Sequence, residues 1–174
     1  MRHVAGRGMP YAAVMNYFVN EDVPLDVLDV GCGYGYIDWT LHSMQFKTTG
    51  IDVSGQAIEF AQKTYGLPFH AMTIQEYAKL GKKHDIAISI EVIEHVKNPK
   101  DLIRKCLEVA PKVIITTPNG GYPAHVGQVW FSDLPPVHLA IFYKEALEGL
   151  AQQLGCGVKI DDSGPNLVAT FNRI

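Results

Sequence analysis

Short apolar runs alternate along the chain with segments in which apolar side chains recur at helical spacing. Apolar runs bounded by glycine and proline predict strands, and the longer periodic segments predict helices. The predicted strands are 27–30, 47–53, 67–72, 85–90, 113–117, 157–161 and 167–171. The predicted helices are 36–44, 54–65, 74–80, 99–109 and 143–154.

The order of these elements predicts the fold class. Strands that alternate with helices are joined by right-handed crossovers and form a largely parallel sheet. Only residues 162–166 separate the last two strands, too few for a crossover helix, so these strands should pair antiparallel. We therefore expect one α/β domain over residues 1–174, with a doubly wound, mostly parallel sheet and an antiparallel C-terminal hairpin.

Composition and charge narrow the classes of function. The chain has 174 residues, 47% apolar and 19% charged, as expected for a single globular domain. Its net charge of −3 argues against a protein that binds a nucleic-acid backbone through its overall charge, although it does not exclude a local basic patch. No apolar run reaches the ~20 residues of a membrane span and no signal peptide is recognisable. Three scattered cysteines, in no metal-ligand spacing, favour a reducing, cytoplasmic location.

The first predicted strand runs into a glycine-rich turn that carries Gly31, Gly33 and Gly35. A strand, a glycine turn and a helix in succession place a ligand at the carboxyl edge of a sheet. The dinucleotide pattern needs a glycine where Tyr36 stands, and no phosphate-loop lysine follows the turn. The turn therefore indicates a ligand other than a dinucleotide or a nucleoside triphosphate.

Two aspartates suggest what that ligand is. Asp29, just before the turn, would repel a pyrophosphate but could face the ammonium of an amino-acid group. Asp52 ends the second predicted strand, about 20 residues after the turn, where an acid can hold ribose hydroxyls. Together the two carboxylates predict a site for a nucleoside that carries an amino acid and no phosphate.

Four motifs, at 27–35, 50–54, 91–96 and 114–119, resemble in order and spacing those of the class I S-adenosylmethionine-dependent methyltransferases. The resemblance implies a seven-stranded Rossmann-like sheet, with S-adenosylmethionine lying across 29–35 and its adenine near 72–74. The residues that we expect to contact this cofactor are Asp29, Gly31, Cys32, Gly33, Gly35, Asp52, Val53, Met72, Thr73 and Glu91.

The sequence Glu-Val-Ile-Glu-His follows the fourth predicted strand, and its ionisable residues would share one face if this stretch were helical. One interpretation is a divalent-cation site for Mg²⁺, Mn²⁺ or Zn²⁺, formed by Glu91, Glu94, His95 and His138. In a second, His95 is a general base, and Glu94 or Glu91 orients it or contacts the cofactor. In a third, the cluster is structural. The signature is similar to those of ubiquinone-pathway O-methyltransferases and of 2′-O-methyltransferases of small-RNA 3′ ends, and both resemblances imply a metal.

The segment 118–142 is long, rich in proline and aromatic residues, and without a periodic pattern. Long loops in compact domains are usually functional, so we expect 119–138 to cap the carboxyl edge and shape the acceptor pocket. A surface loop that packs its own aromatic side chains is the alternative. Tyr11 and Tyr17, ahead of the first strand, should pack a helix on the sheet rather than close over the cofactor.

The function that these patterns favour is methylation of a hydroxyl on a small molecule. The fourth strand is not followed by the Asn/Asp-Pro-Pro-aromatic motif of enzymes that methylate amino groups of DNA bases, which favours oxygen as the acceptor atom. The alternatives are a catalytically inactive methyltransferase-like binding module, a 2′-O-methyltransferase of RNA ends, and a nicotinamide oxidoreductase that Tyr36 and Asp29 disfavour. A homodimer that supplies part of the acceptor pocket is a further option.

Overall fold

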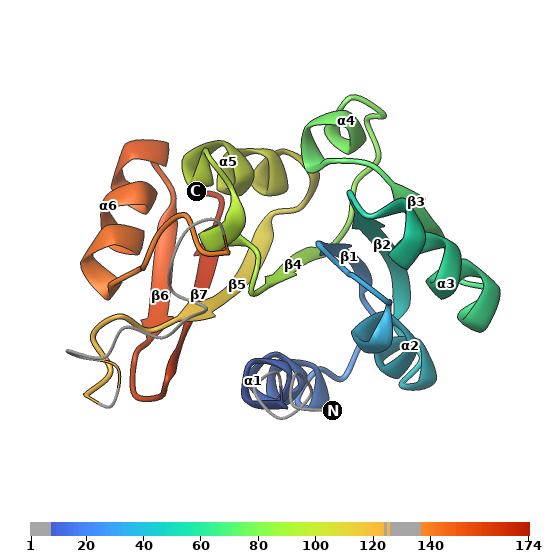
Figure 1. Cartoon of the computed structure of the whole chain (residues 1–174), viewed down its shortest axis with the longest axis horizontal. Coiled ribbons are helices and arrows are strands. Elements are labelled where there is room, and N and C mark those ends of the chain that lie inside the picture. Colours follow the sequence, from blue (N-terminus) through green and yellow to red (C-terminus); the bar gives the residue numbers. More distant parts are fainter. Residues whose placement is uncertain (1–7, 124, 126–136) are drawn as a thin grey trace.

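The computed structural model describes residues 8–123, 125 and 137–174, in which seven strands form one sheet in the order β3-β2-β1-β4-β5-β7-β6 (Figure 1). The strands are β1 (Asp26–Val30), β2 (Lys47–Asp52), β3 (Phe69–Ala71), β4 (Ile86–Ile90), β5 (Lys112–Pro118), β6 (Gly157–Asp161) and β7 (Asn166–Asn172). The first five pair in parallel, and β7 pairs antiparallel with both β5 and β6. The predicted fold class, with its antiparallel C-terminal hairpin, is confirmed.

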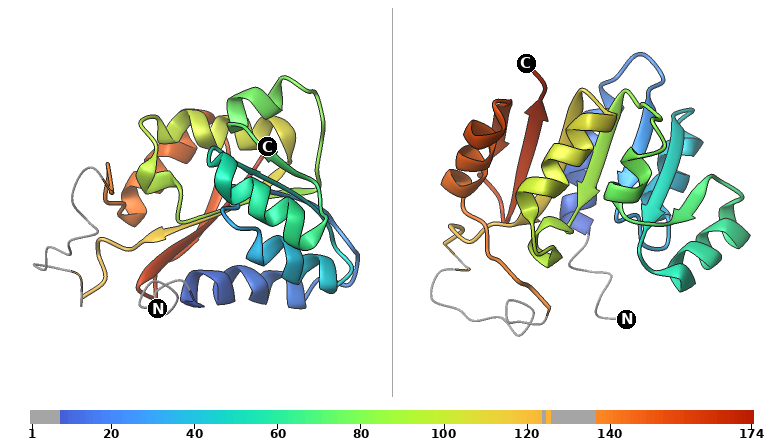
Figure 2. Two further views of the ribbon diagram at one scale, coloured as in Figure 1. Left: turned by 45° about the vertical axis from the view of Figure 1, so that its right-hand side comes forward. Right: turned by 90° about the horizontal axis from the view of Figure 1, so that it is seen from above.

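Helices cover both faces of the sheet (Figures 1 and 2). Buried side chains of α1 and α2 pack on one face, and those of α4, α5 and α6 on the other. Helix α3 packs its Ile58 and Ala61 around Phe69 near the β3 edge. The helices are α1 (Gly8–Val19), α2 (Tyr36–Ser43), α3 (Gly55–Tyr65), α4 (Ile74–Ala78), α5 (Pro99–Val109) and α6 (Lys144–Leu154).

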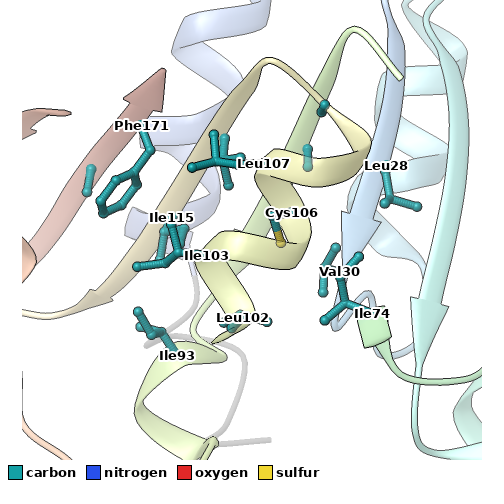
Figure 3. Packing of buried hydrophobic residues seen from close by; sticks show 14 of the residues in the cluster. Leu28, Val30, Ile74, Ile93, Leu102, Ile103, Cys106, Leu107, Ile115 and Phe171 are labelled. Atoms are coloured by element: carbon teal, nitrogen blue, oxygen red, sulfur yellow. The ribbon is translucent and has the colours of Figure 1, made fainter. Parts of the chain in front are cut away.

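Helix α5 shows how an apolar stripe forms the core. Its buried Leu102, Ile103 and Cys106 recur at three- and four-residue spacing, so they face one side. Figure 3 shows them beside side chains of the sheet such as Val30 and Ile115. Asn98 caps the helix by accepting a hydrogen bond from the Asp101 amide, and proline occupies the first turn.

Strand β3 and the stretch after β4 differ from the expectation for physical reasons. Strand β3 begins at Phe69 rather than Leu67, because Pro68 has no amide hydrogen to donate to a neighbouring strand. After β4 the chain forms only a short 3₁₀ turn, Ile93–His95. Glu91 precedes this turn, so Glu91 and Glu94 do not share a helix face.

The strand directions gather chemically useful residues at one edge of the sheet. Among the parallel strands, β1 ends immediately before Gly31, β2 ends at Asp52, and β4 ends immediately before Glu91. Strand β7 runs the opposite way, so its first residue, Asn166, pairs with Pro118 at this same edge. Across the described part of the chain, no helix is both long and apolar enough to cross a membrane.

Candidate cofactor and acceptor site

A cavity of about 920 Å³ opens at the carboxyl edge of the sheet. Most of the residues expected to contact the cofactor line it, namely Gly31, Cys32, Gly33, Asp52, Val53, Met72, Thr73 and Glu91. Asp29 and Gly35 are not among its lining residues. Ligand cavities at this position in open α/β sheets are the rule, because the strand order reverses between β1 and β4 and the connections that follow these strands lead to opposite faces of the sheet.

Asp52 connects two segments at the mouth of the cavity. Its Oδ2 accepts a hydrogen bond from the Gly33 amide at 2.9 Å, and its Oδ1 accepts one from the Ser54 amide at 2.7 Å. Ser54 in turn caps α3 by accepting a hydrogen bond from the Ala57 amide. Each carboxylate oxygen has a second acceptor position, so Asp52 can still accept hydrogen bonds from ligand hydroxyls.

The glycines of the turn serve different purposes. Gly31 has φ +84°, and a Cβ atom there would lie 2.4 Å from the Val92 side chain. Gly35 has φ +75°, and a Cβ atom there would lie 2.5 Å from the Phe69 ring, away from the cavity. Glycine at position 35 is therefore explained by close packing of the turn on β3 and by its left-handed backbone.

Two buried carboxyl groups lie behind the turn. Asp29 and Asp38 are 2% and 1% exposed, and neither oxygen of Asp38 has a hydrogen-bond donor. Burial, followed by the like charge of Asp38, raises the pKa of Asp29 well above its usual range. Burial raises the pKa of Asp38 to about 7. Asp38 gave no signal in the sequence, because an aspartate in the first turn of a helix is ordinarily exposed.

Glu91 adopts an unusual backbone conformation on the cavity wall. Its φ of +56° lies in the left-handed region, which few non-glycine residues adopt; Gln45, just after α2, is the other described example. Its Oε1 accepts hydrogen bonds from Thr116 Oγ1 at 3.0 Å and from Asn166 Nδ2 at 3.1 Å. Burial, followed by the negative charge of Glu94, raises the pKa of Glu91 to about 7.

Glu94, His95 and His138 form a compact group beside this wall. One potential ligand atom from each lies within 4.8 Å of the others. Glu94 is 1% exposed; its Oε2 accepts a hydrogen bond from Thr117 Oγ1 at 3.0 Å, and its Oε1 is buried without a donor. Burial raises the pKa of Glu94 to about 7. Glu91, which we expected in this group, lies outside it among the described residues.

The hydrogen bond of His95 determines which of its ring nitrogens faces the group. Nδ1 lies 2.5 Å from the carbonyl oxygen of Val137, so it carries the hydrogen and donates. In the neutral ring, Nε2 then keeps a free lone pair, and it lies 3.9 Å from Glu94 Oε1. The ring centroids of His95 and His138 are 4.8 Å apart. The group thus presents a carboxylate oxygen and imidazole nitrogens to one point.

Only part of the predicted cap over the carboxyl edge lies in the described residues, and Trp130 and Phe131 fall outside them. Within the described part, Asn119 is buried and its amide donates to the carbonyl oxygens of Asp162 and Gly164. The start of the segment is thereby fixed to the β6–β7 turn. Its end brings His138 to the Glu94 group, as expected.

Tyr11, from which we expected packing rather than closure over the cofactor, lines the cavity, so the N-terminal helix contributes to the site as well as to packing. Sequence reasoning missed other residues that shape the site. Thr117 and Asn166 matter through hydrogen bonds to residues far away in sequence, which no local pattern reveals. Away from the site, at the opposite end of the sheet, the buried His84 ring forms hydrogen bonds with Asp26 and Tyr77, and no pattern in the sequence indicated this network.

A methyltransferase-domain family model matches residues 6–159, most of the chain. The chain belongs to the class I S-adenosylmethionine-dependent methyltransferases. The match includes β1 with its glycine turn, β2 with Asp52, and the segment that carries the Glu94 group, so the family's cofactor is S-adenosylmethionine.

Curated methyltransferases named ubiquinone biosynthesis O-methyltransferase are similar to the chain over its larger part. The one from Rickettsia canadensis is 36% identical over 115 residues, which cover 62% of this chain and 48% of that protein. The one from Rickettsia conorii is 33% identical over 126 residues, which cover 68% and 43%. The chain thus spans about half the length of these relatives.

Solved methyltransferase structures share the fold. The methyltransferase domain of bacterial CtHen1 has a TM-score of 0.71 at 23% identity, with 94% of this chain and 98% of that chain covered. Magnesium protoporphyrin IX methyltransferase from Synechocystis, with bound S-adenosylmethionine, has a TM-score of 0.73 at 18% identity, with 98% and 81% covered. At these identities the likeness concerns the fold alone.

Proposed function

We propose that the protein transfers the methyl group of S-adenosylmethionine to a hydroxyl oxygen of a small molecule, with the help of a divalent cation. The observation that carries this proposal is the Glu94–His95–His138 group, which brings together a buried carboxylate oxygen that accepts no hydrogen bond and imidazole nitrogens within 4.8 Å of one another. This point lies next to the cavity, whose wall includes His95.

The donor set fits a divalent cation. A buried carboxylate oxygen without a donor is unfavourable by itself, and a cation bound to it would remove that penalty. One carboxylate and two imidazoles suit Zn²⁺ or Mn²⁺ better than Mg²⁺, which prefers oxygen ligands. We infer that Glu94, His95 and His138 would hold the ion. Glu91 could join them only if its side chain moved. When bound, the ion would lower the pKa of an acceptor hydroxyl.

The chain's own residues have separate tasks in this proposal. Asp52 accepts hydrogen bonds from the ribose hydroxyls while it also holds the Gly33 amide. Met72 and Thr73 line the end of the cavity expected to hold the adenine. In the absence of a cation, His95 Nε2 is the group that would accept the acceptor's proton, because Val137 occupies Nδ1. Methyl transfer requires mainly alignment of the two reactants and removal of this proton.

A small acceptor agrees with the dimensions and lining of the cavity. A cavity of about 920 Å³ is at the upper end of the range typical of small-molecule sites. Part of it must hold the cofactor, which leaves room for a compact acceptor. The relatives named for ubiquinone biosynthesis support a small aromatic hydroxyl as the acceptor class. We retain methylation of RNA ends as the second candidate, because the sequence Glu-Val-Ile-Glu-His at 91–95 resembles that of the 2′-O-methyltransferases of small-RNA 3′ ends.

The test is a transfer assay with methyl-labelled S-adenosylmethionine. Small phenols and catechols, short RNA, and an aromatic amine are offered separately, with Mn²⁺ or with excess chelator. We expect label in a methyl ether of a phenolic acceptor, and at least about tenfold less product with chelator. Transfer to RNA alone, or to the amine alone, would contradict small-molecule O-methylation. Equal activity with and without chelator would contradict the role of the cation.

A further inference from the structure

Glu91 lies where the cofactor's positive charge must come, if the proposed function holds. Along the carboxyl edge the strands follow in the order β3-β2-β1-β4. The expected adenine contacts Met72 and Thr73 follow β3, and the expected ribose contact Asp52 ends β2. The methionine part of the ligand, with its sulfonium, must then extend past β1 toward the end of β4. Glu91 is the cavity-lining carboxylate at that end.

The orientation of Glu91 is fixed from behind by two residues of other strands. Thr116 and Asn166 both donate to Oε1, at 3.0 and 3.1 Å, and the Glu91 amide donates to the Thr116 carbonyl at 3.1 Å. Both side-chain donors are uncharged, so they orient the carboxylate without neutralising its charge. Because these bonds engage one oxygen, Oε2 is the oxygen that can turn to a ligand.

The backbone of Glu91 supports a functional orientation. A left-handed glutamate at φ +56° is strained and persists only where the surroundings determine it. Here the surroundings are three hydrogen bonds: the Glu91 amide donates to the Thr116 carbonyl oxygen, and the Thr116 and Asn166 side chains donate to Glu91 Oε1. The antiparallel direction of β7 is what brings Asn166 to this edge, 75 residues away from Glu91 in the sequence.

We propose that Thr116 and Asn166 are positioning residues that hold the Glu91 carboxylate against the positively charged sulfur of S-adenosylmethionine, so that the site distinguishes the methyl donor from the product, whose sulfur is uncharged. Methyl transfer turns the sulfonium into the neutral thioether of S-adenosylhomocysteine, and the attraction to Glu91 disappears with the charge. The arrangement therefore favours exchange of product for a new methyl donor.

The test compares the affinities of chelator-treated protein for S-adenosylmethionine and S-adenosylhomocysteine by isothermal titration. Glu91→Gln keeps an oxygen that Thr116 and Asn166 can bond but removes the charge. We expect it to weaken binding of S-adenosylmethionine about tenfold and binding of S-adenosylhomocysteine less than about twofold. Asn166→Leu should shift the ratio of the two affinities in the same direction by about threefold, because Thr116 keeps one bond.

Two matched controls accompany these variants. Glu148→Gln removes a carboxylate from the exposed face of α6, and Asn172→Leu replaces a half-buried asparagine at the other end of β7. Neither should change the ratio. Equal weakening of both ligands in Glu91→Gln and Asn166→Leu, or no weakening, in protein with an unchanged circular-dichroism spectrum would overturn the inference. If the unaltered protein bound neither ligand, the proposed function itself would fail, and this inference with it.

Discussion

The glycine turn with Asp52 and the Glu94–His95–His138 group lie at the same edge of the sheet, yet their hydrogen bonding differs. Both oxygens of Asp52 accept backbone amides, from Gly33 and Ser54. Glu94, in contrast, keeps one buried oxygen without a donor. The hydrogen bonds that hold the turn thus form without a ligand, whereas the Glu94 oxygen still lacks a donor or a cation. Under the proposed function, the difference separates the part that we assign to the cofactor from the part that we assign to the acceptor.

The largest effect that this comparison predicts is on the turn. Asp52→Ala removes the acceptor for the ribose hydroxyls and leaves the Gly33 and Ser54 amides without their carboxylate. We expect affinity for S-adenosylhomocysteine, measured by isothermal titration, to fall at least about 100-fold, since charge-assisted hydrogen bonds are lost. Binding of Mn²⁺ should change little, because the Glu94 group is untouched.

A matched control for Asp52→Ala exists at the end of β6. Asp161 also accepts a hydrogen bond from the amide two residues later, that of Ser163, but it is exposed and does not line the cavity. Asp161→Ala should leave the affinity unchanged. An Asp52→Ala variant that bound S-adenosylhomocysteine as tightly as the unaltered protein would break the assignment of Asp52 to the ribose.

A smaller change in affinity is expected when the Glu94–His95–His138 group is altered. His95→Ala removes one of the imidazoles that converge with Glu94, so Mn²⁺ affinity should fall at least about tenfold. Affinity for S-adenosylhomocysteine should stay within about twofold. The control is His42→Ala, which removes an exposed histidine from α2. Equal Mn²⁺ binding by the His95→Ala variant would show that the group is not a cation site.

The smallest expected effect concerns the two carboxyls beneath the turn. Burial raises the pKa of Asp38 to about 7, above its value in the unfolded chain. The folded state therefore binds this proton more tightly, and stability should decrease as the pH rises from about 4 to 7. Asp38→Asn removes this group's contribution. Between pH 5 and pH 8, the free energy of unfolding should decrease in both proteins, and the decrease should be smaller in the variant by on the order of 2 kcal/mol.

Urea unfolding at the two pH values measures this difference. Asp22→Asn, in an exposed segment, should leave the pH dependence unchanged. An identical pH dependence in Asp38→Asn and in the unaltered protein would mean that the buried pair does not hold an extra proton in the folded state.

The cofactor half was predictable because its signals are local. The glycine turn follows β1 directly, and Asp52 ends β2, so short stretches of sequence were enough to predict the conformation and the cavity-lining position of these residues. Helix α5 has the predicted bounds for the same reason, with a cap, a proline and a regular apolar stripe in one segment. The antiparallel hairpin followed from the length of a single connection.

The other half was less predictable because long-range contacts determine it. Nothing in the sequence requires a left-handed backbone at Glu91; contacts with Thr116 and Asn166, 25 and 75 residues away, hold it there. The helix on which the shared face depended does not form at Glu91, and Glu91 separates from Glu94 and His95. The approach of His138 was expected only from resemblance and from its position in the long loop.

Titration of the unaltered, chelator-treated protein with S-adenosylhomocysteine, in the absence and then in the presence of Mn²⁺, tests the central claim most directly. The account predicts one micromolar site for S-adenosylhomocysteine without any metal, and separate binding of Mn²⁺ to the Glu94–His95–His138 group. Absence of S-adenosylhomocysteine binding under both conditions would contradict the account, as would binding that depends strictly on Mn²⁺.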